Sequence, residues 1–137
     1  MSRFLMTVCM VASLGGCAGS GPAPCGPGLG SSVTLFTLFF GRSIPGRGDL
    51  TDKEWQVFLD RTITANLPNG YTILDASGGW MNPVTHKTVK EPTKVLLVAL
   101  PDVPDSLTAV NRIRTAYQID FHQQLVGMTI QSGCGTF

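Results

Sequence analysis

Four charged side chains are the strongest candidates for chemistry in this sequence. Arg42 follows a predicted β-strand, and its planar guanidinium could hold a carboxylate through two parallel hydrogen bonds. Asp75, Glu91 and Lys94 fall on two later strands, where they could lie near one another. A carboxylate beside aromatic rings such as Trp80 could have a raised pKa and act as a base. The same residues also suit a structural ion pair that locks a hairpin to the first loop, and this interpretation is favoured.

Other patterns that carry chemistry in proteins are incomplete here. The loop at 41–48 follows a strand and precedes a helix, but it lacks the Lys-Ser/Thr pair with which a P-loop reaches phosphates and magnesium. His86 falls in a polar turn and His122 at the end of a predicted helix, so they form no common site. The serines lack a nucleophile elbow, and no acidic or His/Cys cluster has metal-ligand spacing. We therefore expect no metal and no cofactor.

The N-terminal residues have the layout of a secretory signal. Arg3 precedes an apolar run that begins at Phe4 and ends in small residues. Leu14-Gly15-Gly16-Cys17 closes this run and resembles the lipobox of bacterial lipoproteins, in which the chain is cut before the cysteine and fatty acyl chains are attached to it. The resemblance implies a signal peptide at 1–16, lipidation at Cys17, and an exported protein held in the cell envelope by lipid.

One alternative to lipidation stays open, namely an ordinary signal peptide with a chance cysteine. A transmembrane helix is a poorer fit, because the apolar run at 4–14 is shorter than the roughly 20 residues that span a bilayer. Ala18 follows the cysteine, which resembles lipoproteins sorted to the outer membrane of two-membrane bacteria. In such a source we expect the protein on that membrane, facing the periplasm.

Cys25 and Cys134 are the cysteines that remain for the folded part. Cys9 leaves with the signal peptide, and Cys17 is consumed by lipid. An even pair in an oxidising compartment forms a disulfide by default. Neither cysteine belongs to a Cys-x-x-Cys motif, which argues against redox chemistry and zinc binding.

Length and charge restrict the kind of protein. Without residues 1–16 the chain has 121 residues, enough for one domain with a core and too few for two. Arg3 is the one charged residue removed, so nine basic residues face nine acidic ones, and the clustered Lys and Arg of a nucleic-acid binder are missing. Residues 17–32 are rich in Gly, Pro and Ser and predict a flexible tether before a single domain at 33–137.

Alternation and capping signals predict six elements in this domain. Thr51-Asp52-Lys53-Glu54 is a capping box that begins the first helix, with Leu50 and Trp55 as its hydrophobic staple. The second helix begins within 101–105, with Asp102 or a neighbour as its cap. The predicted strands are 33–40, 71–77, 94–100 and 125–131, and Glu91-Pro92 is expected to interrupt the third strand near its start. The first helix is expected to end at 66–70. The apolar stripe of the second helix is Leu107, Val110, Ile113, Tyr117 and Phe121.

The order of these elements predicts an α+β fold of the ferredoxin-like, split βαβ kind. The predicted order is strand, helix, strand, strand, helix, strand. This order gives a four-stranded antiparallel sheet with both helices on one face. The last strand then lies antiparallel beside the first, which brings Cys25 near Cys134 and supports a disulfide between them.

The first and third strands are apolar on both faces, although two helices cover only one face of a sheet. A large uncovered apolar face usually marks an interface or a ligand site. Pairing with a second copy of the chain, sheet against sheet, would cover it. Cover by the tether or by an apolar ligand is the alternative.

From Leu38 onward the chain resembles an exported bacterial family catalogued as domain of unknown function 3574. The family has no established activity, so the resemblance implies no catalytic residue. The residues that carry it are Leu38-Phe39-Phe40-Gly41-Arg42, Trp55, Leu74-Asp75-Ala76, Trp80, Glu91-Pro92-Thr93-Lys94-Val95-Leu96 and Ser132-Gly133-Cys134-Gly135-Thr136-Phe137.

Two functional hypotheses follow from the sequence. The first is a lipid-anchored, non-enzymatic envelope protein whose domain binds a partner or a small ligand, as a homodimer. The second is a small dimeric ferredoxin-like enzyme that uses a cavity on the open sheet face and residues among Arg42, Asp75, Trp80 and Glu91. A pocket with convergent polar groups would favour the enzyme, whereas an exposed patch suffices for a binding domain.

Overall fold

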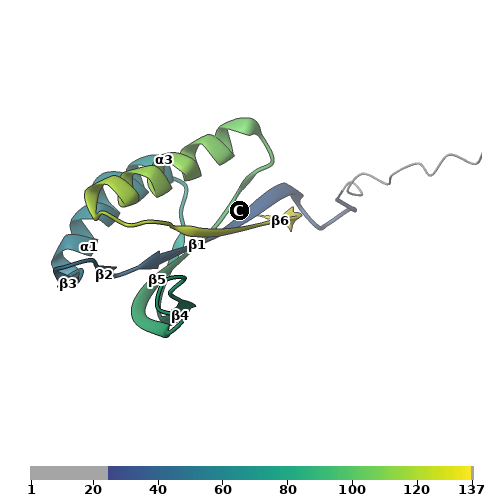
Figure 1. Cartoon of the computed structure of the whole chain (residues 1–137). Helices are drawn as coiled ribbons and strands as arrows, with labels where there is room; N and C mark the ends of the chain where they lie inside the picture. Colours follow the sequence, from purple (N-terminus) through teal and green to yellow (C-terminus); the bar gives the residue numbers. More distant parts are fainter. Residues whose placement is uncertain (1–24, 137) are drawn as a thin grey trace, which may run out of the picture.

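The computed structural model describes residues 25–136 as one four-stranded sheet with helices on one side (Figure 1). The predicted signal peptide, Cys17 and the first part of the tether lie outside the described residues. No helix within the described part is long and apolar enough to cross a membrane. The elements in chain order are β1 (Ser31–Gly41), β2 (Ser43–Ile44), β3 (Gly48–Asp49), α1 (Asp52–Phe58), the π-helical segment η1 (Leu59–Ile63), α2 (Thr64–Asn66), β4 (Thr72–Met81), β5 (Thr88–Pro101), α3 (Pro104–Asp120) and β6 (Gly127–Gly135).

The sheet has the strand order β4-β5-β1-β6, and every neighbouring pair is antiparallel. This is the predicted ferredoxin-like arrangement. The last strand begins two residues later than predicted and continues to Gly135, because its far half pairs with Ser31–Leu35 of β1. β5 also runs unbroken through Pro92, where an interruption was predicted. Pro92 lies beyond the last residue of β1 that pairs with β5, so its missing N–H costs the central ladder nothing.

The disulfide between Cys25 and Cys134 is present, with the two Cα atoms 5.8 Å apart. The register explains it, because Cys134 is the partner of Ser32 and the chain turns back at 27–29 just before β1. The bridge therefore joins the start of the domain to its last strand.

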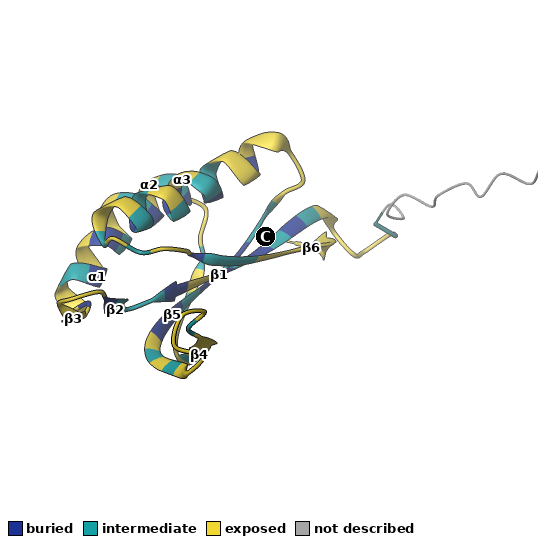
Figure 2. Cartoon of the chain, in the orientation of Figure 1, coloured by how far each residue is buried: buried dark blue, intermediate teal, exposed yellow. Residues whose placement is uncertain are grey.

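Alternate residues of β1 and β5 point toward the helices and form the core (Figure 2). Phe40 is at its centre, in edge-to-face contact with the rings of Trp55, Phe58 and Tyr117 at centroid distances of 5.5, 6.3 and 4.8 Å. The other fully buried side chains around this aromatic group include Leu38, Leu50, Ile63, Leu67, Leu96, Val110, Ile113 and Val126.

The first helix begins as predicted. The Thr51 side chain accepts a hydrogen bond from the Glu54 amide, the Glu54 carboxylate accepts one from the Thr51 amide, and Leu50 and Trp55 are both buried. These bonds from Thr51, with one from Arg47, lower the pKa of Glu54 to about 2.

The helix continues through a π-helical turn that the sequence did not predict. Phe58 and Ile63 are five residues apart, a spacing that would place them on different sides of an α-helix. The i→i+5 bonding of η1 keeps both side chains in the core.

The start of α3 differs from the prediction. Its N-cap is Val103, which makes no side-chain capping bond, and the Asp102 carboxylate instead accepts a hydrogen bond from the Thr34 hydroxyl at 3.0 Å. Leu107 is exposed rather than part of the apolar stripe. Ser106 takes that buried position, where its hydroxyl donates to the carbonyl of Pro101 at 2.7 Å. Ser106 stands four residues before Val110 and seven before Ile113, so it lies on the buried stripe of the helix, whereas Leu107 lies to one side of it.

Candidate functional site

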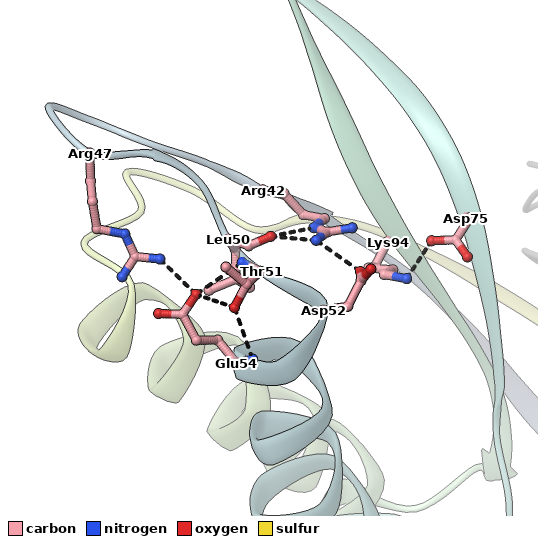
Figure 3. Close-up of polar contacts among 8 residues, drawn as sticks. All are labelled: Arg42, Arg47, Leu50, Thr51, Asp52, Glu54, Asp75 and Lys94. Carbon is pink, nitrogen blue, oxygen red and sulfur yellow. Dashed lines mark hydrogen bonds and ion pairs between the residues drawn. The ribbon is translucent and has the colours of Figure 1, made fainter.

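Arg42 lies at the end of β1 and closes the loop that leads to α1 (Figure 3). Its Nε donates to the Leu50 carbonyl at 3.0 Å, and its terminal nitrogen bonds the same carbonyl and forms an ion pair with Asp52 at 2.9 Å. The backbone of Arg42 accepts a hydrogen bond from the Leu50 amide and donates one to the carbonyl of Pro92. The guanidinium is mostly buried and is committed to these partners, so it holds the loop rather than presenting itself to a ligand.

The rest of this loop is held by hydrogen bonds to side chains of α3, of the segment after α3, and of β5. The hydroxyl of Tyr117 donates to the Gly41 carbonyl at 2.9 Å, and Gln123 donates to the Ser43 carbonyl at 2.9 Å. The Ser43 amide donates to the Glu91 carboxylate at 3.2 Å. Burial raises the pKa of Tyr117 well above its usual value, so this phenol stays protonated as a donor. Among residues 25–136, no buried polar side-chain atom lacks a partner.

Lys94 and Asp75 form an ion pair across the β4–β5 ladder. Lys94 is buried on the helix side, where its ammonium lies 5.9 Å from the centre of the Trp55 ring, and Asp75 is exposed at the sheet edge. The hydrogen bond from Lys94 lowers the pKa of Asp75, with a further contribution from the charge of Arg42. A general base at neutral pH would need the opposite shift.

Glu91 lies on the other face of the sheet. It alternates with Lys94 along β5, and a Cβ added to Gly41 would come within 2.7 Å of its carboxylate. The structure therefore brings Asp75, Lys94 and Arg42 to the helix side, and the Glu91 carboxylate reaches the loop from the opposite side. The four predicted residues do not converge on one point, and each contacts groups that hold the fold together.

The contacts predict a clear difference between two arginines of this loop. Arg42→Gln should lower the free energy of unfolding by about 1–3 kcal/mol, because the buried Leu50 carbonyl loses its charged donor. Arg47→Gln is the matched control: Arg47 forms an exposed ion pair with Glu54, and such pairs contribute roughly 0–1 kcal/mol. Urea unfolding of both variants measures the difference, and equal stabilities would contradict the structural role of Arg42.

The sheet face away from the helices, here called the open face, is mainly apolar over β4, β5 and β1 and carries small or polar residues on β6. It is formed by alternate residues of all four strands. None of its residues is charged in the stretch of β1 from Val33 to Phe39, or at the positions of the other strands that pair with this stretch. The Phe39 ring packs over Gly127 of β6, where a Cβ would stand 3.4 Å from the ring. The residues on this face are Val33, Leu35, Thr37, Phe39, Thr72, Leu74, Ala76, Val95, Leu97, Ala99, Gly127, Thr129, Gln131 and Gly133; Thr93 lies on the same face but is buried.

A shallow hollow of about 360 Å³ lies on the helix side, between α1–η1 and the end of α3. Phe58 and Phe121 provide its apolar lining, and Lys53 and Arg61 lie at its border with two acidic residues. No local pattern in the sequence predicts this hollow, since it exists only through the packing of two helices distant in the chain. Within the described part of the chain, no group of three or more His, Cys, Asp or Glu side chains could hold a metal ion.

Comparison with known families gives a match over residues 36–137 to the family described as "Protein of unknown function (DUF3574)". The chain belongs to the DUF3574 family. The predicted resemblance is thereby confirmed. Two of its motifs in this DUF3574 domain, 38–42 and 91–96, meet at the Arg42 loop, and the third, 132–137, includes the cysteine of the disulfide. A comparison with curated proteins found no match.

Solved structures are similar to this DUF3574 domain at low sequence identity. A phage SAM lyase in complex with S-methyl-5'-thioadenosine is 18% identical, with a TM-score of 0.57 over 82% of this chain and 87% of the other. CutA from Synechococcus elongatus is 10% identical, with a TM-score of 0.49 over 75% of this chain and 78% of the other. The phage enzyme supports the fold, and at this identity it supports nothing further.

Proposed function

We propose that this DUF3574 domain is a lipid-anchored interaction domain of the bacterial envelope that pairs with a second copy through the open face. The observation that carries the proposal is the uncharged surface from β4 to β6, which is mainly apolar over β4, β5 and β1 and on which Phe39 and Leu74 are exposed. Apolar surfaces of this extent on soluble domains usually mark interaction sites.

The chemistry of the open face favours a second copy as the partner. The centres of protein interfaces are depleted of charged residues, as this surface is. A two-fold pairing places the same patch on both chains, and a patch without charge meets its copy without electrostatic repulsion. β1, β5 and β6 pair over nine residues and β4 lies beside them over five, so at about 4.8 Å between strands and about 3.4 Å per residue the projected face is roughly 500 Å². This is near the lower limit of specific interfaces, which bury about 600 Å² on each partner.

The location belongs to the same proposal and rests on the N-terminal residues. The lipobox-like Leu14-Gly15-Gly16-Cys17 supports removal of residues 1–16 and lipidation of Cys17. The residues between Cys17 and Cys25 would then connect the lipid to the disulfide end of the sheet. In a two-membrane source the expected site is the outer membrane, on its periplasmic side.

Native mass spectrometry of a soluble chain that begins at Ala18 tests the pairing, since this chain retains every element and the disulfide. We expect a dimer, and we expect Leu74→Asp to shift it to monomer, because the carboxylate would be buried without a partner. Leu107→Asp is the matched control: the exposed fractions are 47% for Leu74 and 41% for Leu107, but Leu107 lies on α3.

Each outcome of this experiment decides the proposal. A dimer lost in Leu74→Asp and kept in Leu107→Asp supports pairing through the open face. A monomer at all concentrations, or a dimer insensitive to Leu74→Asp, overturns it. Electrophoretic mobility and mass of the wild-type full chain, compared with a Cys17→Ser variant, test the lipid separately.

The alternative function, a small enzyme that uses the open face, can be tested with a defined ligand. The fold is shared with a phage lyase whose structure holds S-methyl-5'-thioadenosine. That compound is therefore a defined ligand to add to the same native samples. Extra mass equal to the compound would favour the enzyme, even though Arg42 and Asp75 are engaged in structural contacts.

A further inference from the structure

The hairpin between β4 and β5 extends past the body of the sheet. Pairing of β5 with β1 ends at Thr93 and Gly41, but pairing with β4 continues for five more residue pairs, from Pro92 with Ser77 to Thr88 with Met81. At about 3.4 Å per residue this adds roughly 17 Å before the turn. Figure 1 shows this hairpin away from both helices. Residues 77–92 are here called the arm.

The arm exposes large apolar side chains at its end. Met81 and Val84 have exposed fractions of 64% and 84%, and Trp80 is also exposed. The turn that presents them is held in one shape, because the Asn82 side chain accepts hydrogen bonds from the amides of Val84 and Thr85 at 2.9 and 3.1 Å. An ordered turn that holds apolar side chains in solvent is suited to binding a surface.

The arm carries two lysines and one glutamate, Glu91, which lies at its base and accepts a hydrogen bond from the Ser43 amide. Lys87 and Lys90 are both exposed, and no acidic residue lies between Asp75 and Glu91. Within the described residues, neither lysine takes part in an ion pair, because the three pairs present involve other cations. The outer part of the arm, from Gly78 to Lys90, therefore carries two positive charges and no negative one, although the whole chain has a net charge of only +1.

We propose that the arm binds the surface of a membrane that contains anionic lipids. Tryptophan is favoured at the headgroup level, and apolar side chains beside it enter the boundary of the acyl region. Lysines near the surface are attracted by anionic headgroups. A second copy of the chain is a poorer occupant, since pairing of two arms across a two-fold axis would bring Lys87 and Lys90 close to their own copies.

The position of the arm fits a chain that is also held by lipid. The disulfide lies at the end of the sheet where β1 begins, and the arm extends from the opposite end, beyond Gly41. A lipid on Cys17 and the arm would therefore attach the domain at two separated points. The arm proposal itself depends neither on that lipid nor on pairing through the open face.

Co-sedimentation of the unlipidated chain that begins at Ala18 with vesicles tests the proposal. The vesicles are phosphatidylcholine alone and phosphatidylcholine with phosphatidylglycerol. We expect binding to the anionic vesicles that weakens with salt. Lys87→Gln with Lys90→Gln should weaken it by roughly 30-fold, and Met81→Ser with Val84→Ser by at least about tenfold.

A matched variant separates the arm from a general effect of apolar surface. Ile119→Ser removes a side chain as exposed as Met81, at 67%, from α3, and it should leave vesicle binding unchanged. Circular dichroism of each variant confirms that it is folded. The proposal is overturned if the wild-type chain binds neither vesicle, or if the arm variants bind as the wild type does. It is also overturned if the variants of Met81 and Val84 lose a dimer in native mass spectra while no form binds vesicles.

Discussion

Replacing Cys25 and Cys134 by serine is expected to lower the free energy of unfolding by up to about 4.7 kcal/mol. The bridge closes a loop with a sequence separation of 109 residues, which includes every helix and nearly all of the sheet. A cross-link over so long a loop restricts the unfolded chain strongly, whereas it changes the folded chain little. Urea unfolding of the oxidised protein and of the double serine variant, each as the chain that begins at Ala18, measures the effect.

Reduction provides the control for this result. Wild-type protein unfolded in reducing agent should match the double serine variant, because both lack the cross-link and otherwise have the same core. Thiol labelling of the unfolded, non-reduced wild type should modify neither Cys25 nor Cys134. A stability difference below about 1 kcal/mol would mean that the reduced, unfolded chain is already restricted in another way.

Replacing Phe40 by alanine should cost about 3–5 kcal/mol. Its ring is fully buried and makes edge-to-face contacts with three other aromatic rings, so its removal leaves a cavity between the sheet and both helices. Phe39→Ala is the matched control, because Phe39 is the adjacent residue of the same strand but lies 40% exposed on the open face. At low protein concentration this change should cost less than about 1.5 kcal/mol.

The concentration dependence of the Phe39 variant adds a second test of pairing. If the open faces pair, wild-type stability rises with protein concentration, since the dimer is favoured by mass action. Phe39→Ala should reduce that rise, and Phe40→Ala should lower stability at every concentration. Equal costs for the two substitutions would contradict the assignment of these neighbouring rings to opposite faces.

The order of elements could be predicted because its signals are local. The capping box at Thr51 and the alternation in β1 depend on residues within one turn or one strand. The π-helical turn at Leu59–Ile63 could not be predicted in this way, since it follows from the need to bury both Phe58 and Ile63 against a sheet distant in the chain. The exposure of Leu107 follows from helical geometry, because Ser106 rather than Leu107 aligns with Val110 and Ile113 on the buried face of α3.

The candidate site was predicted only in part for the same reason. The pairing of Asp75 with Lys94 follows from hairpin register and opposite charge, and the structure contains it. Glu91 is separated from that pair because it lies on the opposite face of β5, and which residues of a strand face which side is known only once the register is fixed. The hydrogen bond from Arg42 to the Leu50 carbonyl forms because the loop between them folds back on itself, and no residue type in the sequence predicts that path.

The Cys25–Cys134 bridge also determines how a mechanical load would enter the domain. A pull on the N-terminal segment reaches Cys25 first and passes through the bridge to β6, so the chain from 26 to 133 forms a closed covalent loop outside the line of force. Neither β1 nor β6 can be peeled away from its free end, because the two ends are joined beside the point of load. A pull between the residues before Cys25 and those after Cys134 would thus pass through the bridge without unravelling the chain from 26 to 133.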